Sequence, residues 1–233
     1  LVMGVINNII PFTLIVWGQK EIASGLASIL NATTPFFTLL IANWLTRDEP
    51  LTANRLAGVA VGLAGVAVMV GIGALENLGT HVAAQFAVLG AALSYGFAGS
   101  WGRRLAVNPP IVTAAGQTLC SGLMLAPIAF STGGFDGLTT ASPQALGAVL
   151  GLGLLCTAIA YVMFFSILKS SGAGNVSLVT FIVPVSAILL GAMVLGERLE
   201  PQHILGMAAI AAGLALIDGR LLRIVRRDPT FRR

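Results

Sequence analysis

The residues of this chain that could do chemistry are uncharged polar side chains set within long apolar stretches. Seven of them carry amide, hydroxyl or phenol groups suited to holding a small polar molecule: Asn7, Asn31, Thr34, Tyr95, Gln117, Tyr161 and Thr180. Asn7 precedes Pro11, and Asn31 and Thr34 precede Pro35. A proline in a helix leaves a backbone carbonyl one turn back without its donor, and nearby amides and hydroxyls then satisfy that carbonyl or bind a ligand. We therefore predict that these seven side chains line a substrate-binding cavity.

The same side chains also have a plainer interpretation. In an apolar environment a polar group must find a partner, and amides and hydroxyls often serve only to cross-link helices. Gln117 is the one large amide in an otherwise small and apolar stretch, which favours cavity lining for it. Thr180 and Pro184 repeat the pairing of Thr34 with Pro35, so we expect Pro184 to loosen its helix as well.

The sequence offers little for catalysis, metal binding or redox chemistry. Ser100, in AGSWG, lacks the G-x-S-x-G spacing of a nucleophile elbow, and His81 and His203 are too isolated for a metal site. No Asp, Glu, Lys or Arg lies near the middle of an apolar stretch, so no proton carrier is evident there. Cys120 and Cys156 are expected to be free, buried and inert. We predict no enzyme activity, no metal and no cofactor.

The composition identifies the environment of these apolar stretches. Hydrophobic residues make up 56% of the chain and charged residues 9%, and the mean hydropathy is +0.91. Soluble domains carry about a quarter charged residues. Several charge-free runs reach the roughly 20 residues that a helix needs to cross a bilayer, and they do not alternate as barrel strands do. The sequence therefore predicts an all-α, polytopic membrane helix bundle.

Turn residues divide the bundle into eight predicted helical spans. These spans lie at about 1–18, 22–45, 52–73, 83–102, 111–131, 145–167, 173–196 and 202–222. Lys and Arg are distributed very unevenly between alternate sides of the spans, with eleven on one side against only Lys20 and Arg198 on the other. Because basic residues accumulate on the cytoplasmic side, we predict a cytoplasmic C-terminus and an outer loop at 131–144, in a plasma membrane of bacterial inner-membrane type.

The net charge of +4 does not indicate nucleic-acid binding. Six of the 13 basic residues lie in the tail after residue 219, where a basic cluster beside a span contacts anionic lipid. The expected partners are therefore the lipid bilayer and a small-molecule substrate, with no nucleic acid. GxxxG patterns occur at Gly58–Gly62 and Gly147–Gly151. They permit close approach of two helices, more typically within one chain. Contact between two chains in a homodimer is the alternative.

Two segments of the chain repeat one another. Ser28 and Pro35 correspond to Ser177 and Pro184; after a slip of one residue, an acidic turn and two glycines also correspond, Glu49, Gly58 and Gly65 with Glu197, Gly206 and Gly213. The first acidic turn falls on the predicted cytoplasmic side and its copy on the outer side. The two units are therefore predicted to be inverted, as in alternating-access carriers.

This repeated pattern, A-S-x6-P followed by an acidic turn and G-x6-G, resembles the EamA-type carriers of the drug/metabolite transporter superfamily. The resemblance implies ten spans in two inverted five-helix repeats. It also implies a permease, with export included, for a small organic metabolite such as an amino acid or related compound. Three spans precede the interruption near Glu76 and five follow it, and the chain begins with Leu1. We therefore expect an N-terminally truncated sequence from a parent of about ten spans.

The expected division of the chain follows the two repeats. Residues 1–75 form the first repeat without its first two helices, residues 83–222 form the second repeat, and residues 223–233 form a basic tail. Two other functions stay open, an intramembrane enzyme and a non-transporting membrane scaffold. The enzyme would need a nucleophile–base pair or metal ligands within the bilayer.

Overall fold

The computed structural model describes residues 1–45, 51–71, 76, 79–131, 141–194 and 200–218, and within these residues the fold is all-helical with no strand. The first half of the chain forms α1 (Val2–Gly4), η1 (Val5–Ile9), α2 (Ile10–Gly18), α3 (Ser24–Asn31), α4 (Thr34–Leu45) and α5 (Ala53–Val70). The second half forms α6 (Val82–Gly102), η3 (Arg103–Leu105), α7 (Pro110–Ser131), α8 (Pro143–Gly151), η4 (Leu152–Ile159), α9 (Ala160–Ser171), α10 (Ala173–Ser177), α11 (Val179–Val194) and α12 (Pro201–Asp218). The acidic turns, most of the 131–144 loop and the basic tail lie outside the described residues.

Local sequence sets where several helices begin and end. Thr52 caps α5 by accepting a hydrogen bond from the Arg55 backbone N–H (3.3 Å), and the α5 helix ends at Gly71, whose φ of +99° favours glycine. Ser142 caps α8 in the same way, with Pro143 in the first turn. These caps explain why helix limits read from the sequence agree with the structure to within a few residues.

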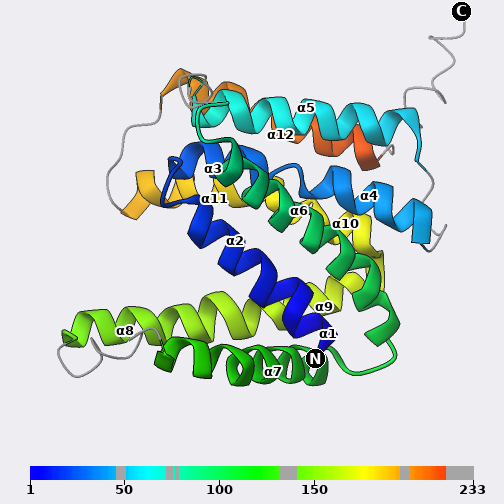
Figure 1. The fold of residues 1–233 in the computed structure, drawn as a ribbon. Helices are drawn as coiled ribbons and strands as arrows, with labels where there is room; N and C mark the ends of the chain where they lie inside the picture. Colours follow the sequence, from blue (N-terminus) through cyan, green and yellow to red (C-terminus); the bar gives the residue numbers. More distant parts are fainter. Residues whose placement is uncertain (46–50, 72–75, 77–78, 132–140, 195–199, 219–233) are drawn as a thin grey trace, which may run out of the picture.

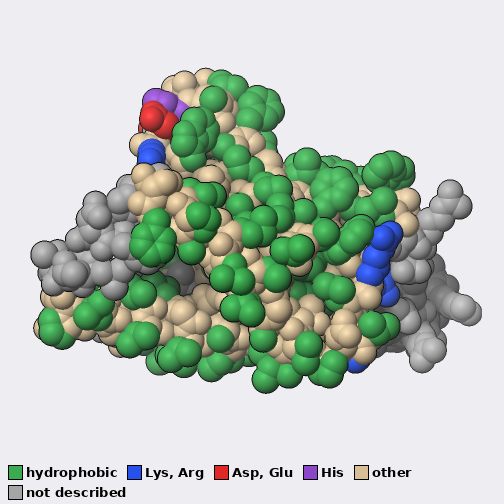
Figure 2. Space-filling view, turned by 60° about the horizontal axis from the view of Figure 1, so that its bottom comes forward, with side chains coloured by type: hydrophobic (Ala, Val, Ile, Leu, Met, Phe, Trp, Pro, Cys, Tyr) green, Lys and Arg blue, Asp and Glu red, His purple; other side chains and the backbone are tan. Residues whose placement is uncertain are grey.

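Length and composition make several helices able to span a bilayer. Six described helical segments are long and apolar enough to do so, and two shorter apolar segments, Val2–Gly18 and Pro201–Ile217, accompany them. On the face shown in Figure 2, hydrophobic side chains cover the middle and charged side chains gather toward the edges. The prediction of eight spans therefore stays a prediction for the two shorter segments.

The helices are arranged between two flanking pairs (Figure 1). The α5 and α12 helices lie side by side at one end of the molecule, and α7 lies beside the continuous α8–η4–α9 segment at the other. The remaining helices cross the space between these pairs, with α6 packed against both α2 and α4.

The α5–α12 pair is held together by the repeated glycines. A Cβ atom added at Gly58 would lie 2.6 Å from the Gly213 carbonyl oxygen, and one added at Gly206 would lie 2.7 Å from the Gly65 carbonyl oxygen. The two helices therefore touch backbone to backbone and run antiparallel. Because Gly206 is the repeat counterpart of Gly58, and Gly213 that of Gly65, these two contacts are counterparts of each other.

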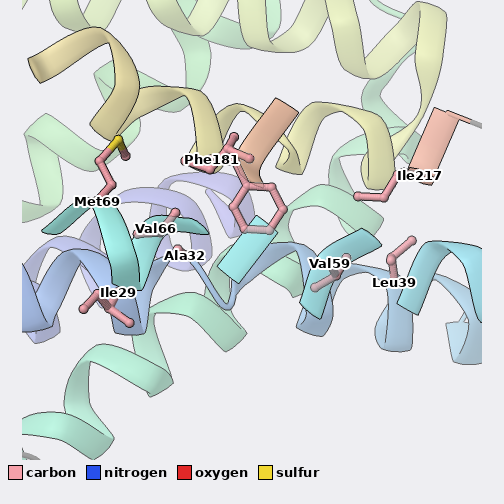
Figure 3. Close-up of a cluster of buried hydrophobic side chains, with 9 residues drawn as sticks. Ile29, Ala32, Leu39, Val59, Val66, Met69, Phe181 and Ile217 are labelled. Atoms are coloured by element: carbon pink, nitrogen blue, oxygen red, sulfur yellow. The ribbon is translucent and has the colours of Figure 1, made fainter. Parts of the chain in front are cut away.

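A hydrophobic cluster extends from this pair into the bundle (Figure 3). Phe181 of α11 is fully buried and faces Gly62, where a Cβ atom would lie 2.8 Å from its ring. The GxxxG pattern at Gly58–Gly62 thus permits close approach within the chain, as predicted. The second pattern does not, because nothing described lies within 4 Å of a Cβ atom at Gly147 or Gly151. That part of the prediction is wrong for the described residues.

Candidate functional site

The first helical segment changes its hydrogen-bond register just before Pro11. Residues Val5–Ile9 form a π-helical turn, in which the Ile10 N–H bonds the Val5 carbonyl. In that register the next donor would be residue 11, but Pro11 has no N–H to offer to the Ile6 carbonyl. The Ser94 hydroxyl of α6 donates to that carbonyl instead, at 2.6 Å. Sequence analysis predicted that a hydroxyl or amide would satisfy this carbonyl, and Ser94 is the residue that does so.

A second π-helical turn occupies the corresponding place in the other repeat. The spacing of 149 residues that relates Ser28 to Ser177 carries η1 onto residues 154–158, which lie inside η4 (Leu152–Ile159). Less than about one per cent of residues are π-helical, and such turns are frequent at functional sites. Sequence analysis predicted neither turn.

The span predicted at 22–45 is broken at the proline. The α3 helix ends at Asn31 and α4 begins at Thr34. Pro35 cannot donate to the Asn31 carbonyl, and the Thr34 hydroxyl does so at 2.7 Å. The second repeat is also broken, between Ser177 and Val179, and Thr180 there donates to the Ser177 carbonyl at 2.8 Å.

A cavity of about 360 Å³ lies where these irregular segments meet. Six of the seven predicted site residues line it, namely Asn7, Asn31, Thr34, Tyr95, Tyr161 and Thr180. They come from η1, α3, α4, α6, α9 and α11, so that segments far apart in the sequence converge here. Aromatic and aliphatic side chains complete much of the wall, among them Phe12, Phe164 and Val183.

The cavity lies between counterparts of the two repeats. The 149-residue spacing pairs Asn7 with Cys156, Phe12 with Tyr161, Asn31 with Thr180 and Thr34 with Val183, and all eight residues line the cavity. Three of the four pairs differ in polarity: Asn7 corresponds to the thiol of Cys156, Phe12 to the phenol of Tyr161, and Thr34 to Val183. The lining residues therefore occupy equivalent positions in the two repeats but differ in chemistry.

Gln117 is the predicted site residue that does not line this cavity. Its side chain is buried behind the wall, where its amide oxygen accepts a hydrogen bond from Asn7 Nδ2 (3.2 Å) and its Nε2 donates to Asn8 Oδ1 (2.9 Å). Instead, Gln117 bridges two adjacent amides of η1. It fits the plainer interpretation of these polar groups, as a link between helices.

Asn8 is the residue that sequence analysis underestimated. Its Oδ1 accepts from the Tyr161 hydroxyl (2.7 Å) as well as from Gln117, and its Nδ2 donates to Ser121 Oγ (2.9 Å). It thereby joins η1 to α7 and α9. Adjacent asparagines before a proline were the available signal, but only the packed structure distinguishes the amide facing the cavity from the one facing the helices.

Two further expectations concern residues outside the predicted set. Cys156 was expected to be buried; it is exposed and lines the cavity, beside Thr157, while Cys120 is half-buried elsewhere. Both thiols are free. Trp101 does not line the cavity, and the Arg104 guanidinium lies over its ring at 4.4 Å in a cation–π contact.

Among the described residues, the lining of the cavity carries no charged side chain: it includes no Asp, Glu, Lys, Arg or His. Within the same ranges no group of three His, Cys, Asp or Glu side chains is placed to hold a metal ion. The cavity can therefore act on a ligand through hydrogen bonds, aromatic faces and apolar contact.

Comparison with known proteins places this arrangement among transporters. The model of the EamA-like transporter family matches residues 1–71 and 82–218. The protein PecM of Dickeya dadantii is 25% identical over 93% of this chain and 72% of its own length. The "Probable terminal-alkyne amino-acid exporter" of Streptantibioticus cattleyicolor is 29% identical over 88% of this chain and 68% of its own.

One crystal structure is similar in fold. It superposes with a TM-score of 0.78, at 21% identity, over 95% of this chain and 75% of that chain. At this identity the likeness concerns the fold alone.

Proposed function

Since the chain belongs to the EamA-like transporter family, we propose that it is a multi-pass membrane carrier that binds a small organic metabolite in the cavity between its two repeats. Amino acids and related compounds are the proposed substrate class, with export as the proposed direction. A relative named as an amino-acid exporter supports this choice. The bacterial inner membrane is the proposed location, with the tail on the cytoplasmic side.

The observation that carries the proposal is the pairing of repeat counterparts around one cavity. Carriers built from inverted repeats hold their substrate at the repeat interface and expose it alternately to either side. The reciprocal Gly58–Gly213 and Gly65–Gly206 contacts support such an inverted relation. The antiparallel α5–α12 pair would form a fixed seam, while the helix breaks between Asn31 and Thr34 and between Ser177 and Val179 would allow the cavity walls to move.

An enzyme is the less favoured candidate. Ser100, the serine considered as a nucleophile, is 3% exposed, and its hydroxyl has no hydrogen-bond partner in the described part of the chain. A nucleophile needs an adjacent base, and none of the described residues that line the cavity carries a carboxylate or imidazole that could serve.

The test is counterflow in proteoliposomes containing the purified chain. Vesicles preloaded with a single unlabelled amino acid or amine are diluted into buffer with a trace of the same compound in radiolabelled form. The proposal expects transient accumulation for at least one member of a panel of amino acids and their amines. It also expects accumulation to fall at least about fivefold in Asn7→Ala, since a binding amide contributes about 1 kcal/mol or more. No accumulation of any compound would contradict it.

A further inference from the structure

We propose that the cavity recognises an amino group: its polar wall presents hydrogen-bond acceptors and selects a ligand that donates, an amine or ammonium carried on an apolar body. This inference rests on the proposed function only in taking the cavity as the substrate site. It concerns which functional group of the substrate the cavity recognises. It follows from which hydrogen-bond donors of the lining residues are already used within the protein.

Seven hydroxyl groups line the cavity, and all but that of Tyr95 donate their single proton to the protein itself. Four of these bonds run back to backbone carbonyls at or near the helix breaks: Thr34 to Asn31 (2.7 Å), Thr38 to Thr34 (2.9 Å), Ser177 to Gly174 (2.7 Å) and Thr180 to Ser177 (2.8 Å). The Thr157 hydroxyl donates to the Leu152 carbonyl (2.9 Å), and that of Tyr161 to Asn8 Oδ1 (2.7 Å). A hydroxyl whose proton is engaged retains only lone pairs.

The buried amide network also orients Asn7 so that its oxygen, and not its nitrogen, is left free to accept a hydrogen bond. Ser121 Oγ donates to the Thr118 carbonyl (3.0 Å), so it accepts from Asn8 Nδ2. Asn8 Oδ1 therefore faces the donors of Gln117 and Tyr161, and the Gln117 oxygen in turn faces Asn7 Nδ2. With its nitrogen held in this chain of bonds, Asn7 keeps its Oδ1 available at the cavity wall.

Asn31 adds a second amide oxygen at the helix break. Its Oδ1 is buried and has no hydrogen-bond partner among the described residues, and the side chain lines the cavity. A buried acceptor without a donor costs about 1–3 kcal/mol. A donor group on a ligand that reached this oxygen would remove that cost.

The numbers of free hydrogen-bond donors and acceptors in the cavity wall determine which type of ligand fits. Donors that remain available are the second N–H of Asn7, the two N–H groups of Asn31 and the Tyr95 hydroxyl. Acceptors are more numerous, and a primary ammonium carries three N–H groups to satisfy them. The aromatic rings of Phe12 and Phe164 also line the cavity, and ring faces attract cations and not carboxylates.

Cys156 provides a direct readout, because it lines the cavity and its thiol is free. In a full-length Cys120→Ser variant, the rate at which a maleimide modifies Cys156 is measured in membrane vesicles with increasing amounts of three probes. The probes share one aromatic body: 2-phenylethylamine, its N-acetyl derivative and 3-phenylpropanoate. The proposal expects the amine to halve the rate at a concentration at least about tenfold lower than the other two.

A matched pair of variants assigns the preference to the wall. Thr180→Val removes one cavity acceptor at nearly constant shape, and it should reduce the preference for the amine about threefold or more. Thr118→Val, on a helix outside the cavity lining, should leave the preference unchanged. Equal protection by all three probes, stronger protection by the carboxylate, or no protection by any of them would overturn the proposal. Transport is not part of this assay, so a carrier of carboxylates would fail here and still pass the counterflow test.

Discussion

The Tyr161 hydroxyl donates a 2.7 Å hydrogen bond to Asn8 Oδ1 across 153 residues of sequence. Tyr161 belongs to α9 and Asn8 to η1, which fall in the second and first predicted repeats, so in the proposed account this bond joins the repeats beside the cavity. Because a carrier of this type must change the relation between its repeats during transport, the bond is one that the proposed mechanism would strengthen in one state and weaken in another.

We expect Tyr161→Phe to lower the stability of the purified protein by about 1 kcal/mol, the usual net contribution of such a bond. Combining it with Asn8→Ala should cost less than the sum of the two single changes, since both remove the same bond. Thermal unfolding in detergent of the wild type, both single variants and the double variant measures this coupling. Additive losses would mean that the two side chains do not interact.

Gln117→Leu should destabilise the fold by about 1–3 kcal/mol, because it leaves Asn7 Nδ2 and Asn8 Oδ1 each short of a buried partner. Gln144→Leu is the matched control, since Gln144 is exposed at the start of α8. Denaturant titration of both variants checks the difference. A Gln117 variant as stable as the control would show that the amide network does not contribute to folding.

Ser94→Ala should cost about 1 kcal/mol by leaving the Ile6 carbonyl without its donor. Adding Pro11→Ala should recover part of that loss, because alanine restores a backbone N–H at the position that proline leaves empty. Ser100→Ala, on the same helix, should be neutral: the Ser100 hydroxyl is buried and has no partner in the described part of the chain. Equal losses for the two serine variants would contradict this assignment.

Gly65→Ala should destabilise the α5–α12 pair by about 1–3 kcal/mol through overpacking. The new Cβ atom would lie 2.8 Å from the Ile210 backbone nitrogen and 2.9 Å from the Gly206 oxygen. Gly147→Ala has open space and should be neutral or stabilising by up to about 1 kcal/mol. The melting temperature of Gly65→Ala should therefore fall, while that of Gly147→Ala should stay the same or rise. Equal changes in the same direction would show that Gly65 does not make this contact.

Sequence reasoning predicted the helices well where charge and proline mark their ends. The span predicted at 111–131 is observed as Pro110–Ser131, and that at 83–102 as Val82–Gly102. Six of the seven side chains that it assigned to a cavity line one cavity in the structure, because a polar group within an apolar helix has to face inward.

The sequence could not separate residues that line the cavity from residues that support its wall. Asn7 and Asn8 are adjacent and chemically identical, and only the π-helical register and the position of Gln117 assign one to each role. Cys156 was expected to be buried because it lies in an apolar run, yet the placement of η4 brings it to the cavity. Such distinctions depend on tertiary contacts between distant segments.

The central claim is that the cavity between the repeats is the path of the substrate, and modification of Cys156 tests it most directly. In a Cys120→Ser background, a bulky methanethiosulfonate reagent should attach to Cys156 and abolish counterflow of whichever compound the proteoliposome panel identifies, and bound substrate should slow that reaction. The Cys120→Ser, Cys156→Ala variant should transport and be insensitive to the reagent. Full transport after quantitative modification of Cys156, confirmed by mass spectrometry, would contradict the claim.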